Sequence, residues 1–191
     1  MKRSSGQNLS IALIHYPVTN KNGDVIASAV TNLDLHDMAR SARTYGVAAF
    51  YVVTPLDDQK ALAAKLVDHW VNGGGARYNP KRCEALQLVH IRDNLQQVID
   101  EIEQANGRRP RIIVTCARAQ SKSVSYGVLR QTLEDGAPAL LLFGTAWGLA
   151  PECMAQADII LDPVQGGSAY NHLSVRAAAA IILDRLCGEF D

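Results

Sequence analysis

Short apolar runs alternate with amphipathic stretches of helical periodicity along this chain, and this alternation constrains its fold more than any other feature. Residues 139–143 are all apolar, which is typical of a central strand that is buried on both faces. Residues 174–186 carry the strongest helical pattern of the chain. Strand and helix signals follow one another about six times, so the sequence predicts an α/β fold with a mostly parallel sheet and helices on both faces.

The individual elements can be placed by periodicity and by glycine, proline and capping signals. We expect strands at residues 10–16, 47–53, 86–91, 111–116, 139–143 and 158–161, and helices at residues 33–45, 57–71, 95–104, 124–133 and 174–186. The glycine run after the second helix is interpreted as a flexible helix terminator. Because ligands in parallel sheets bind outside the carboxyl ends of the strands, the loops after Phe143 and Leu161 are the first candidate sites.

Length and charge narrow the classes of protein to consider. The 191 residues suit one compact domain that spans the whole chain, 1–191, and an apolar content of 48% is enough for a full core. The 19 basic and 19 acidic side chains cancel, which disfavours a protein that coats nucleic acid by charge alone. A local basic patch is compatible with this balance.

Several kinds of site and targeting signal have no counterpart in the sequence. No apolar run reaches the length of a membrane span, and the first ten residues do not resemble a secretory signal. The four cysteines are widely spaced and the histidines are scattered, so we expect no metal site, and a reducing cytoplasm is the natural compartment. P-loop, dinucleotide-binding glycine and serine-hydrolase motifs do not occur.

Three segments carry the motifs that point to a function. They are residues 37–47 (DMARSARTYGV), residues 140–152 (LLLFGTAWGLAPE) and residues 161–181 (LDPVQGGSAYNHLSVRAAAAI). Taken singly, each fits an ordinary element: an amphipathic helix with a glycine stop, a buried strand with a turn, and a glycine-rich loop before a core helix. Their order and spacing favour a shared functional origin.

Together the three segments resemble the motifs of the SPOUT methyltransferase superfamily, particularly its SpoU branch. The first matches the N-x-x-R-T/S-A-x-x-x-G-V helix of that branch, with Asp37 in place of the usual asparagine and with Arg40 retained. The second is similar to a strand followed by F-G-x-E-x-x-G-L, but Ala146 stands near the expected glutamate. The third is similar to a proline–glycine loop before an S-L-N-V-S-x-A-A helix, with one extra residue between Asn171 and Ser174.

Nearly the whole chain is also similar to a small bacterial family of SPOUT RNA methyltransferases, in which a Y-N-H-L-S-V-R run and an A-x-Y-N-P tract recur. The resemblance implies a C-terminal trefoil knot, with S-adenosylmethionine held in it largely by backbone amides and carbonyls. Glycines suit close approach of backbone to a ligand, and leucine and phenylalanine suit the apolar walls of an adenine site. The implied cofactor-binding residues are Leu142, Phe143, Gly144, Thr145, Gly148, Leu161, Pro163, Gly166, Gly167, Tyr170, Asn171, Leu173 and Ser174.

The resemblance also implies the residues that act on the substrate, which is expected to be tRNA or rRNA. Arg40 maps to the arginine that the SpoU branch uses at the methyl-transfer step. Arginine is normally protonated and makes a poor base, so Arg40 is expected to orient a ribose hydroxyl or a phosphate. Asp37 and His36 are the alternative proton acceptors if the target is a guanine ring nitrogen rather than a ribose 2′-oxygen.

RNA binding requires a positive surface, and two stretches offer one. Six basic residues and no acid occur between residues 107 and 130, and Arg118 and Lys122 are the candidate contacts there. Arg77 and Tyr78 form the second candidate, because a tyrosine among arginines can stack an unpaired base.

Two further expectations concern the assembly and the class of function. The apolar residues of the last helix cover much of its circumference, and in relatives that helix packs across a twofold axis, so a homodimer is expected. A SPOUT-fold module that binds cofactor or RNA without turnover remains the alternative to an enzyme. The altered second motif and the zero net charge favour the module, whereas Arg40 and the region around Asn171 favour an active methyltransferase.

Overall fold

A six-stranded parallel sheet forms the centre of the protein in the computed structural model, which describes residues 8–168 and 170–189. The strand order is β5-β4-β1-β7-β6-β8, and every pair is parallel. The predicted mostly parallel sheet is therefore confirmed. The strands are β1 (Leu9–Ile14), β4 (Phe50–Val53), β5 (Val89–Arg92), β6 (Arg111–Val114), β7 (Ala139–Gly144) and β8 (Ile159–Ile160).

Strands β1 and β7 lie side by side in the middle of the sheet, and both are covered on both faces. Their registered pairs run from Leu9↔Ala139 to Ile14↔Gly144. Because both faces are buried, the two strands read as continuous apolar runs rather than as alternating patterns. Successive side chains of β1 enter opposite cores, with Leu13 in one hydrophobic cluster and Ile14 in the other.

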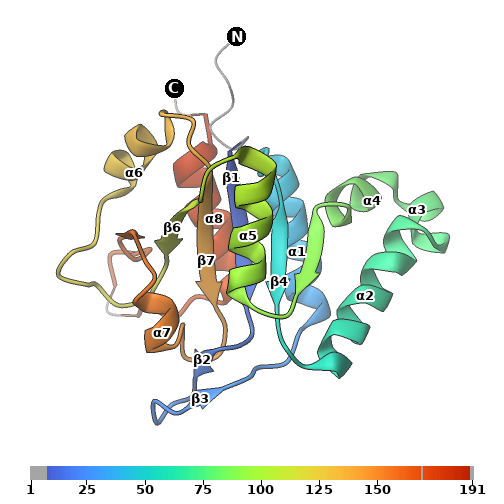
Figure 1. The fold of residues 1–191 in the computed structure, drawn as a ribbon, viewed down its shortest axis with the longest axis horizontal. Helices are drawn as coiled ribbons and strands as arrows, with labels where there is room; N and C mark the ends of the chain where they lie inside the picture. The colour runs from blue at the N-terminus through green and yellow to red at the C-terminus, as the bar shows by residue number, and fades with distance from the viewer. Residues whose placement is uncertain (1–7, 169, 190–191) are drawn as a thin grey trace.

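Helices cover both faces of the sheet, as predicted (Figure 1). Figure 1 shows α5 in front of the sheet and α1 and α8 behind it. One face packs against α1 (Asn32–Thr44), α2 (Asp57–Val71), α4 (Pro80–Leu86), α6 (Tyr126–Leu133) and α8 (Val175–Cys187). The other face packs against α5 (Leu95–Asn106) and α7 (Pro151–Met154). No helix in the described part of the chain is long and apolar enough to cross a membrane.

The glycine run after α2 is the clearest departure from the sequence prediction. Helix α2 ends where expected, but the chain re-enters helix at once in α3 (Gly74–Tyr78), so the flexible-terminator interpretation was wrong. A Cβ on Gly75 would lie 2.6 Å from the ring of Trp70, closer than real contacts allow. Glycine is required there by packing, which periodicity cannot reveal. The hairpin of β2 (Val18–Thr19) and β3 (Val25–Ile26) was also not predicted.

His15 follows β1 directly and is fully buried. Its Nδ1 atom lies 3.0 Å from the Ser28 hydroxyl, whereas its Nε2 atom has no hydrogen-bond partner among the described residues. Burial lowers the pKa of His15 from 6.5 to about 4, against a smaller opposing effect of Asp34. The imidazole is therefore neutral in the folded protein at neutral pH.

Protonation of His15 should make the fold sensitive to mild acid. The pKa is about 6.5 in the unfolded chain and about 4 in the folded one, so only the unfolded state gains a proton between these values. The stability contribution is complete above pH 6.5 and is lost as pH falls toward 4, by up to about 3 kcal/mol. Urea unfolding of the native chain between pH 7 and 4 should therefore show a steeper loss of stability than the His15→Asn variant.

The exposed His172 provides the matched control, because His172→Asn should keep the native pH dependence. Parallel stability curves for the native chain and His15→Asn would contradict the prediction.

Candidate functional site

Three loops leave the carboxyl ends of the neighbouring strands β7, β6 and β8, and parallel strands bring them to one edge of the sheet. We call them the β6 loop (residues 115–124), the β7 loop (residues 145–149) and the β8 loop (residues 161–174). Every residue expected to bind the cofactor lies at the end of β7, in the β7 loop or in the β8 loop. The structure therefore brings the second and third sequence motifs to the same edge.

The β8 loop is fastened to the β6 loop at both of its ends. Near its start, the amide of Asp162 donates to the carbonyl of Val124 at 2.9 Å, and the hydroxyl of Ser123 donates to the Asp162 carboxylate. Near its end, the Asn171 side chain donates to the carbonyl of Ala117 at 2.9 Å. Asn171 thus holds the end of the β8 loop against the β6 loop.

Between these attachments the β8 loop has free backbone and open space. Among the described residues of 163–173, no amide or carbonyl makes a backbone–backbone hydrogen bond. A Cβ added at Gly166 or Gly167 would meet no atom within 4 Å. The side chains of Tyr170 and Leu173 are 73% and 44% exposed. The amide and carbonyl of Tyr170 bond to the Ser168 hydroxyl at 3.3 Å. Polar backbone that is otherwise unpaired, beside exposed apolar side chains, fits a ligand such as an adenosine, which has a flat ring with polar edges.

Three of the expected apolar walls lie in the cores rather than at the surface. Leu142, Phe143 and Leu161 are at most 1% exposed, and Pro163 is also buried. Their side chains hold the strands in place, so only their backbone is available at the edge. Leu173 is the member of the expected set whose apolar side chain is free to contact a ligand.

Hydrogen bonds on both sides hold the β7 loop rigidly. The amide of Trp147 donates to the carbonyl of Thr19 at 3.0 Å, and the amide of Thr19 donates to the carbonyl of Gly148 at 2.9 Å. The Thr145 hydroxyl donates to the carbonyl of Ile14 at 2.9 Å and lies 2.5 Å from the Ser28 hydroxyl. The side chain of Thr145 therefore connects the β7 loop to the end of β1 and to Ser28.

A groove of about 520 Å³ separates α1 from α8. Helix α8 begins at its cap Ser174, the last residue of the β8 loop, so the groove opens where that loop ends. Asp37 and Arg176 contact one another at one end of the helix pair, and Tyr45 and Asp184 do so at the other. Asp37 and Tyr45 are eight residues, or about 12 Å, apart along α1, and Arg176 and Asp184 are equally far apart along α8. The two contacts therefore occur in the same order on both helices, so α1 and α8 run parallel. The lining residues are Asp37, Arg40, Ser41, Thr44, Tyr45, Ser174, Arg176, Ala177 and Ala180.

Arg176 bridges two carboxylates of α1. Its guanidinium lies 3.2 Å from Asp34 and 3.5 Å from Asp37, which are one helical turn apart. Asp34 is buried and also accepts a hydrogen bond from the Thr31 hydroxyl at 2.6 Å. Sequence reasoning missed Asp34 and Arg176, although the i, i+3 spacing of the two acids places them on one helix flank.

Asp37 and Arg40 both line the groove, whereas His36 is not among its lining residues. Arg40 is exposed, and its guanidinium has no hydrogen bond or ion pair with any described residue. His36 lies about one turn before Arg40 on α1, and its ring packs edge-on against Trp70 at 5.4 Å. Burial, followed by the charge of Arg82, lowers the pKa of His36. Its Nδ1 atom is buried without a partner among the described residues.

The candidate RNA contacts form two separate surfaces. Arg118 and Lys122 are exposed on the β6 loop, whereas Arg77 and Tyr78 are exposed on α3, with Tyr78 85% accessible. Figure 1 shows α3 beyond α2 on one side of the molecule and the β6 loop on the other. The basic stretch between residues 107 and 130 is also divided between two places. Its residues 108–111 line a pocket at the amino end of β6, away from the β6 loop.

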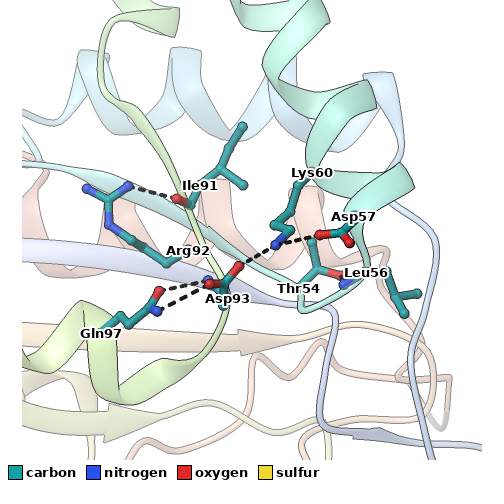
Figure 2. Close-up of polar contacts among 8 residues, drawn as sticks. All are labelled: Thr54, Leu56, Asp57, Lys60, Ile91, Arg92, Asp93 and Gln97. Carbon is teal, nitrogen blue, oxygen red and sulfur yellow. Dashed lines mark hydrogen bonds and ion pairs between the residues drawn. The ribbon is translucent and has the colours of Figure 1, made fainter.

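A further polar cluster lies at the carboxyl ends of β4 and β5 (Figure 2). Lys60 of α2 contacts Asp57 at 2.9 Å and Asp93 at 2.5 Å, and Gln97 donates to Asp93 at 3.3 Å. The two acids raise the pKa of Lys60 through these hydrogen bonds. These charges satisfy one another and fasten α2 to the start of α5. Within residues 8–168 and 170–189, no group of three or more histidine, cysteine or acidic side chains could hold a metal ion.

The glycines of the two motifs should respond differently to substitution. A Cβ on Gly144 would lie 2.6 Å from the amide nitrogen of Leu149, so no side chain fits without moving the β7 loop. Gly144→Ala should therefore lower the free energy of unfolding by about 1–3 kcal/mol. Gly166→Ala, in open space, should change it by less than about 0.5 kcal/mol. Equal midpoints for the two variants in thermal denaturation would contradict this assignment.

Comparison with known proteins links this geometry to a family. A family model for SAM-dependent RNA methyltransferases matches residues 8–188. A protein of Oleidesulfovibrio alaskensis named tRNA (guanine-N(1)-)-methyltransferase is 46% identical over 96% of this chain, but the match spans only 43% of that protein. An uncharacterized protein of Aquifex aeolicus is 42% identical over 94% of this chain and 88% of its own length.

A solved structure supports the same fold. The SpoU methyltransferase AviRb of Streptomyces viridochromogenes, in complex with the cofactor AdoMet, superposes with a TM-score of 0.57 at 19% identity. The match covers 95% of this chain and 60% of that one. Since the family model spans nearly all described residues, this chain belongs to the family of SAM-dependent RNA methyltransferases.

Proposed function

We propose that this protein transfers a methyl group from S-adenosylmethionine to an RNA, with tRNA as the substrate class. The observation that carries the proposal is the continuity of the free β8 loop with the groove that contains Arg40, through Ser174. The guanine-N1 activity in the name of the Oleidesulfovibrio protein supports tRNA as substrate, although more than half of that protein lies outside the match. The fold and the family membership support the cofactor.

The cofactor would lie against the end of β7, the β7 loop and the β8 loop, and it would supply an activated methyl group on a sulfonium. Backbone groups and Leu173 would contact it directly, while Asn171 and Thr145 hold the loops in position. The proposed site keeps the full expected set: Leu142, Phe143, Gly144, Thr145, Gly148, Leu161, Pro163, Gly166, Gly167, Tyr170, Asn171, Leu173 and Ser174.

Arg40 and Asp37 are the proposed catalytic groups. The free guanidinium of Arg40 can bind a phosphate or hydroxyl of the RNA, which aligns the attacking atom with the methyl group. The Asp37 carboxylate lies in the same groove and can accept a proton. A carboxylate in this place favours a guanine ring nitrogen over a ribose 2′-oxygen as the target. Both lose a proton on methylation, but N1 of guanine is more acidic than a ribose hydroxyl, so a weak base such as a carboxylate can accept its proton more easily. His36 has no proposed role, since it lies outside the groove.

A homodimer and a trefoil knot complete the proposal. Within one chain, α8 is already covered by the sheet, α1 and α6, so its apolar residues alone no longer require a partner. The groove beside α8 supports the dimer instead, because the arginine equivalent to Arg40 approaches the partner's cofactor in relatives. The attachments between the β6 and β8 loops support the knot. A cytoplasmic location suits an RNA substrate and four free cysteines.

A methyl-transfer assay tests the function itself. The purified chain would be incubated with labelled S-adenosylmethionine and total RNA from a strain that lacks the protein, and the product would be located by mass mapping. Incorporation at one nucleotide identifies the RNA and the methylated atom. Cofactor binding without incorporation would instead establish the non-catalytic module, which the alanine at position 146 favours.

Replacement of Arg40 should separate chemistry from cofactor binding. Arg40→Ala should lower turnover by about two orders of magnitude or more, the usual range for one positioned group, and leave cofactor affinity within a few-fold. Arg43→Ala is the matched control, because Arg43 lies one turn along α1 but contacts Glu84 outside the groove. Full turnover by Arg40→Ala would show that this arginine takes no part in the reaction.

Mixing two inactive variants tests whether the site is shared between subunits. Arg40→Ala retains the cofactor loop, and Gly166→Val retains Arg40 but should lose the cofactor. If Arg40 acts on the partner's cofactor, mixed dimers contain one complete site and should restore about a quarter of native activity. No recovery would place Arg40 and the cofactor in one subunit.

Charge reversal tests the RNA contact of the β6 loop. Arg118→Glu with Lys122→Glu should weaken RNA binding and flatten its salt dependence, because fewer counterions are released from the RNA. The control is Arg108→Glu with Arg109→Glu, which changes the same number of charges at the opposite edge. Equal effects of the two pairs would indicate non-specific attraction rather than a contact at the reacting edge.

A further inference from the structure

Trp147 stands at the tip of the β7 loop with 64% of its surface exposed. Its indole N–H has no hydrogen-bond partner among the described residues, and its ring contacts no aromatic or cationic side chain there. Burying a tryptophan is strongly favourable, so leaving one exposed forgoes stability that the chain could have gained. Neither the core, the groove nor the expected cofactor contacts use this side chain.

The loop that carries Trp147 is built to hold it in one place. The amide of Trp147 donates to the carbonyl of Thr19, and the amide of Thr19 donates to the carbonyl of the next residue, Gly148. Ala146 has φ 51°, the one positive value among the described residues other than glycine. A strained backbone of this kind persists only where the surroundings determine it, and such residues cluster at functional sites. The backbone at Trp147 is therefore held in place, and the exposed ring projects from a fixed point.

The position of the loop places this ring beside the proposed reaction. Strand β7 ends between β1 and β6, so the β7 loop emerges next to the β6 loop and one strand away from the β8 loop. In Figure 1 this edge is the one where β7 points toward α7 and the β2–β3 hairpin. The exposed cations Arg118 and Lys122 lie on the neighbouring β6 loop. A ligand with both flat rings and phosphates would meet complementary groups here.

We propose that Trp147 is the stacking platform for an unpaired base of the RNA substrate. The inference rests on the proposed RNA methylation and adds the residue that recognises the nucleotide. A base inside a duplex cannot reach a protein ring or a methyl donor, so the target must be presented unstacked, and a flat indole replaces the lost stacking. Base–aromatic stacking contributes about 1–3 kcal/mol, which corresponds to an affinity change of about 5- to 150-fold. Nearby phosphates would contact the β6 loop.

Tryptophan fluorescence tests the proposal, because the chain has only two tryptophans and they differ in environment. Trp70 is half-buried, with Arg82 4.4 Å above its ring and His36 at 5.4 Å. The Trp70→Phe variant leaves Trp147 as the single emitter. We expect bulk tRNA from a strain lacking the protein to quench its emission, and a blunt duplex RNA to quench it far less. S-adenosylhomocysteine alone should cause little change.

Affinity measurements give the second readout. Trp147→Ala should weaken tRNA binding by about 5- to 150-fold, and Trp147→Phe should recover most of the loss. Both should keep the native melting temperature and affinity for S-adenosylhomocysteine, since most of the side chain is exposed and it belongs to neither hydrophobic core. Unchanged tRNA affinity in Trp147→Ala, or equal quenching by duplex RNA, would overturn the proposal. Quenching by S-adenosylhomocysteine alone would assign the ring to the cofactor.

Binding and turnover separate this inference from the proposed function. If tRNA quenches Trp147 but no methyl group is transferred, the stacking platform stands and the enzymatic function fails. If methyl transfer occurs with native kcat and KM in Trp147→Ala, the function stands and the platform fails.

Discussion

Parallel pairing between β1 and β7 is the constraint on which the candidate site depends. The pairs from Leu9↔Ala139 to Ile14↔Gly144 hold both strands in the centre of the sheet, buried on both faces. The contact continues past the strand ends, because the amide of Thr145 donates to the carbonyl of Ile14 at 3.3 Å. One register therefore fixes where the β7 loop leaves the sheet. The same register determines where the β2–β3 hairpin bonds to the β7 loop and how close the β6 loop lies to it.

Ion pairs between α1 and α8 connect the β8 loop, at the edge of the sheet, to the groove. A buried carboxylate such as Asp34 is costly unless it is paired and hydrogen-bonded, and Arg176 supplies the opposite charge. Arg176 lies two residues beyond Ser174, the end of the β8 loop, and it also contacts Asp37. One side chain therefore connects the end of the β8 loop to the helix α1 that carries Arg40. The proposed cofactor and substrate sites are linked by this short chain of contacts.

Periodicity predicted the elements that tertiary packing does not alter, such as α2, whose bounds agree with the prediction. It missed the β2–β3 hairpin, because strands of two residues are too short to show alternation. It misread Gly75, whose place is set by the distant ring of Trp70. At the candidate site, motif resemblance singled out Arg40, but which neighbouring residues share its groove depends on tertiary packing. His36 precedes Arg40 by about one helical turn, yet its ring packs against Trp70 and does not line the groove.

A chain with zero net charge has to attract RNA locally, since opposite charges cancel beyond the screening length of about 10 Å at 0.1 M salt. Ion pairs near the reacting edge permit such local attraction, because they neutralise acidic side chains there. Arg176 compensates two acids of α1, and Lys60 compensates two more beside β5. Arg118 and Lys122 on the β6 loop have no such acidic partner among the described residues, so their charge remains available to phosphates. Under the proposed function, short-range contacts of this kind, together with stacking, would determine affinity. Binding would then depend on the shape of the presented nucleotide more than on the length of the RNA.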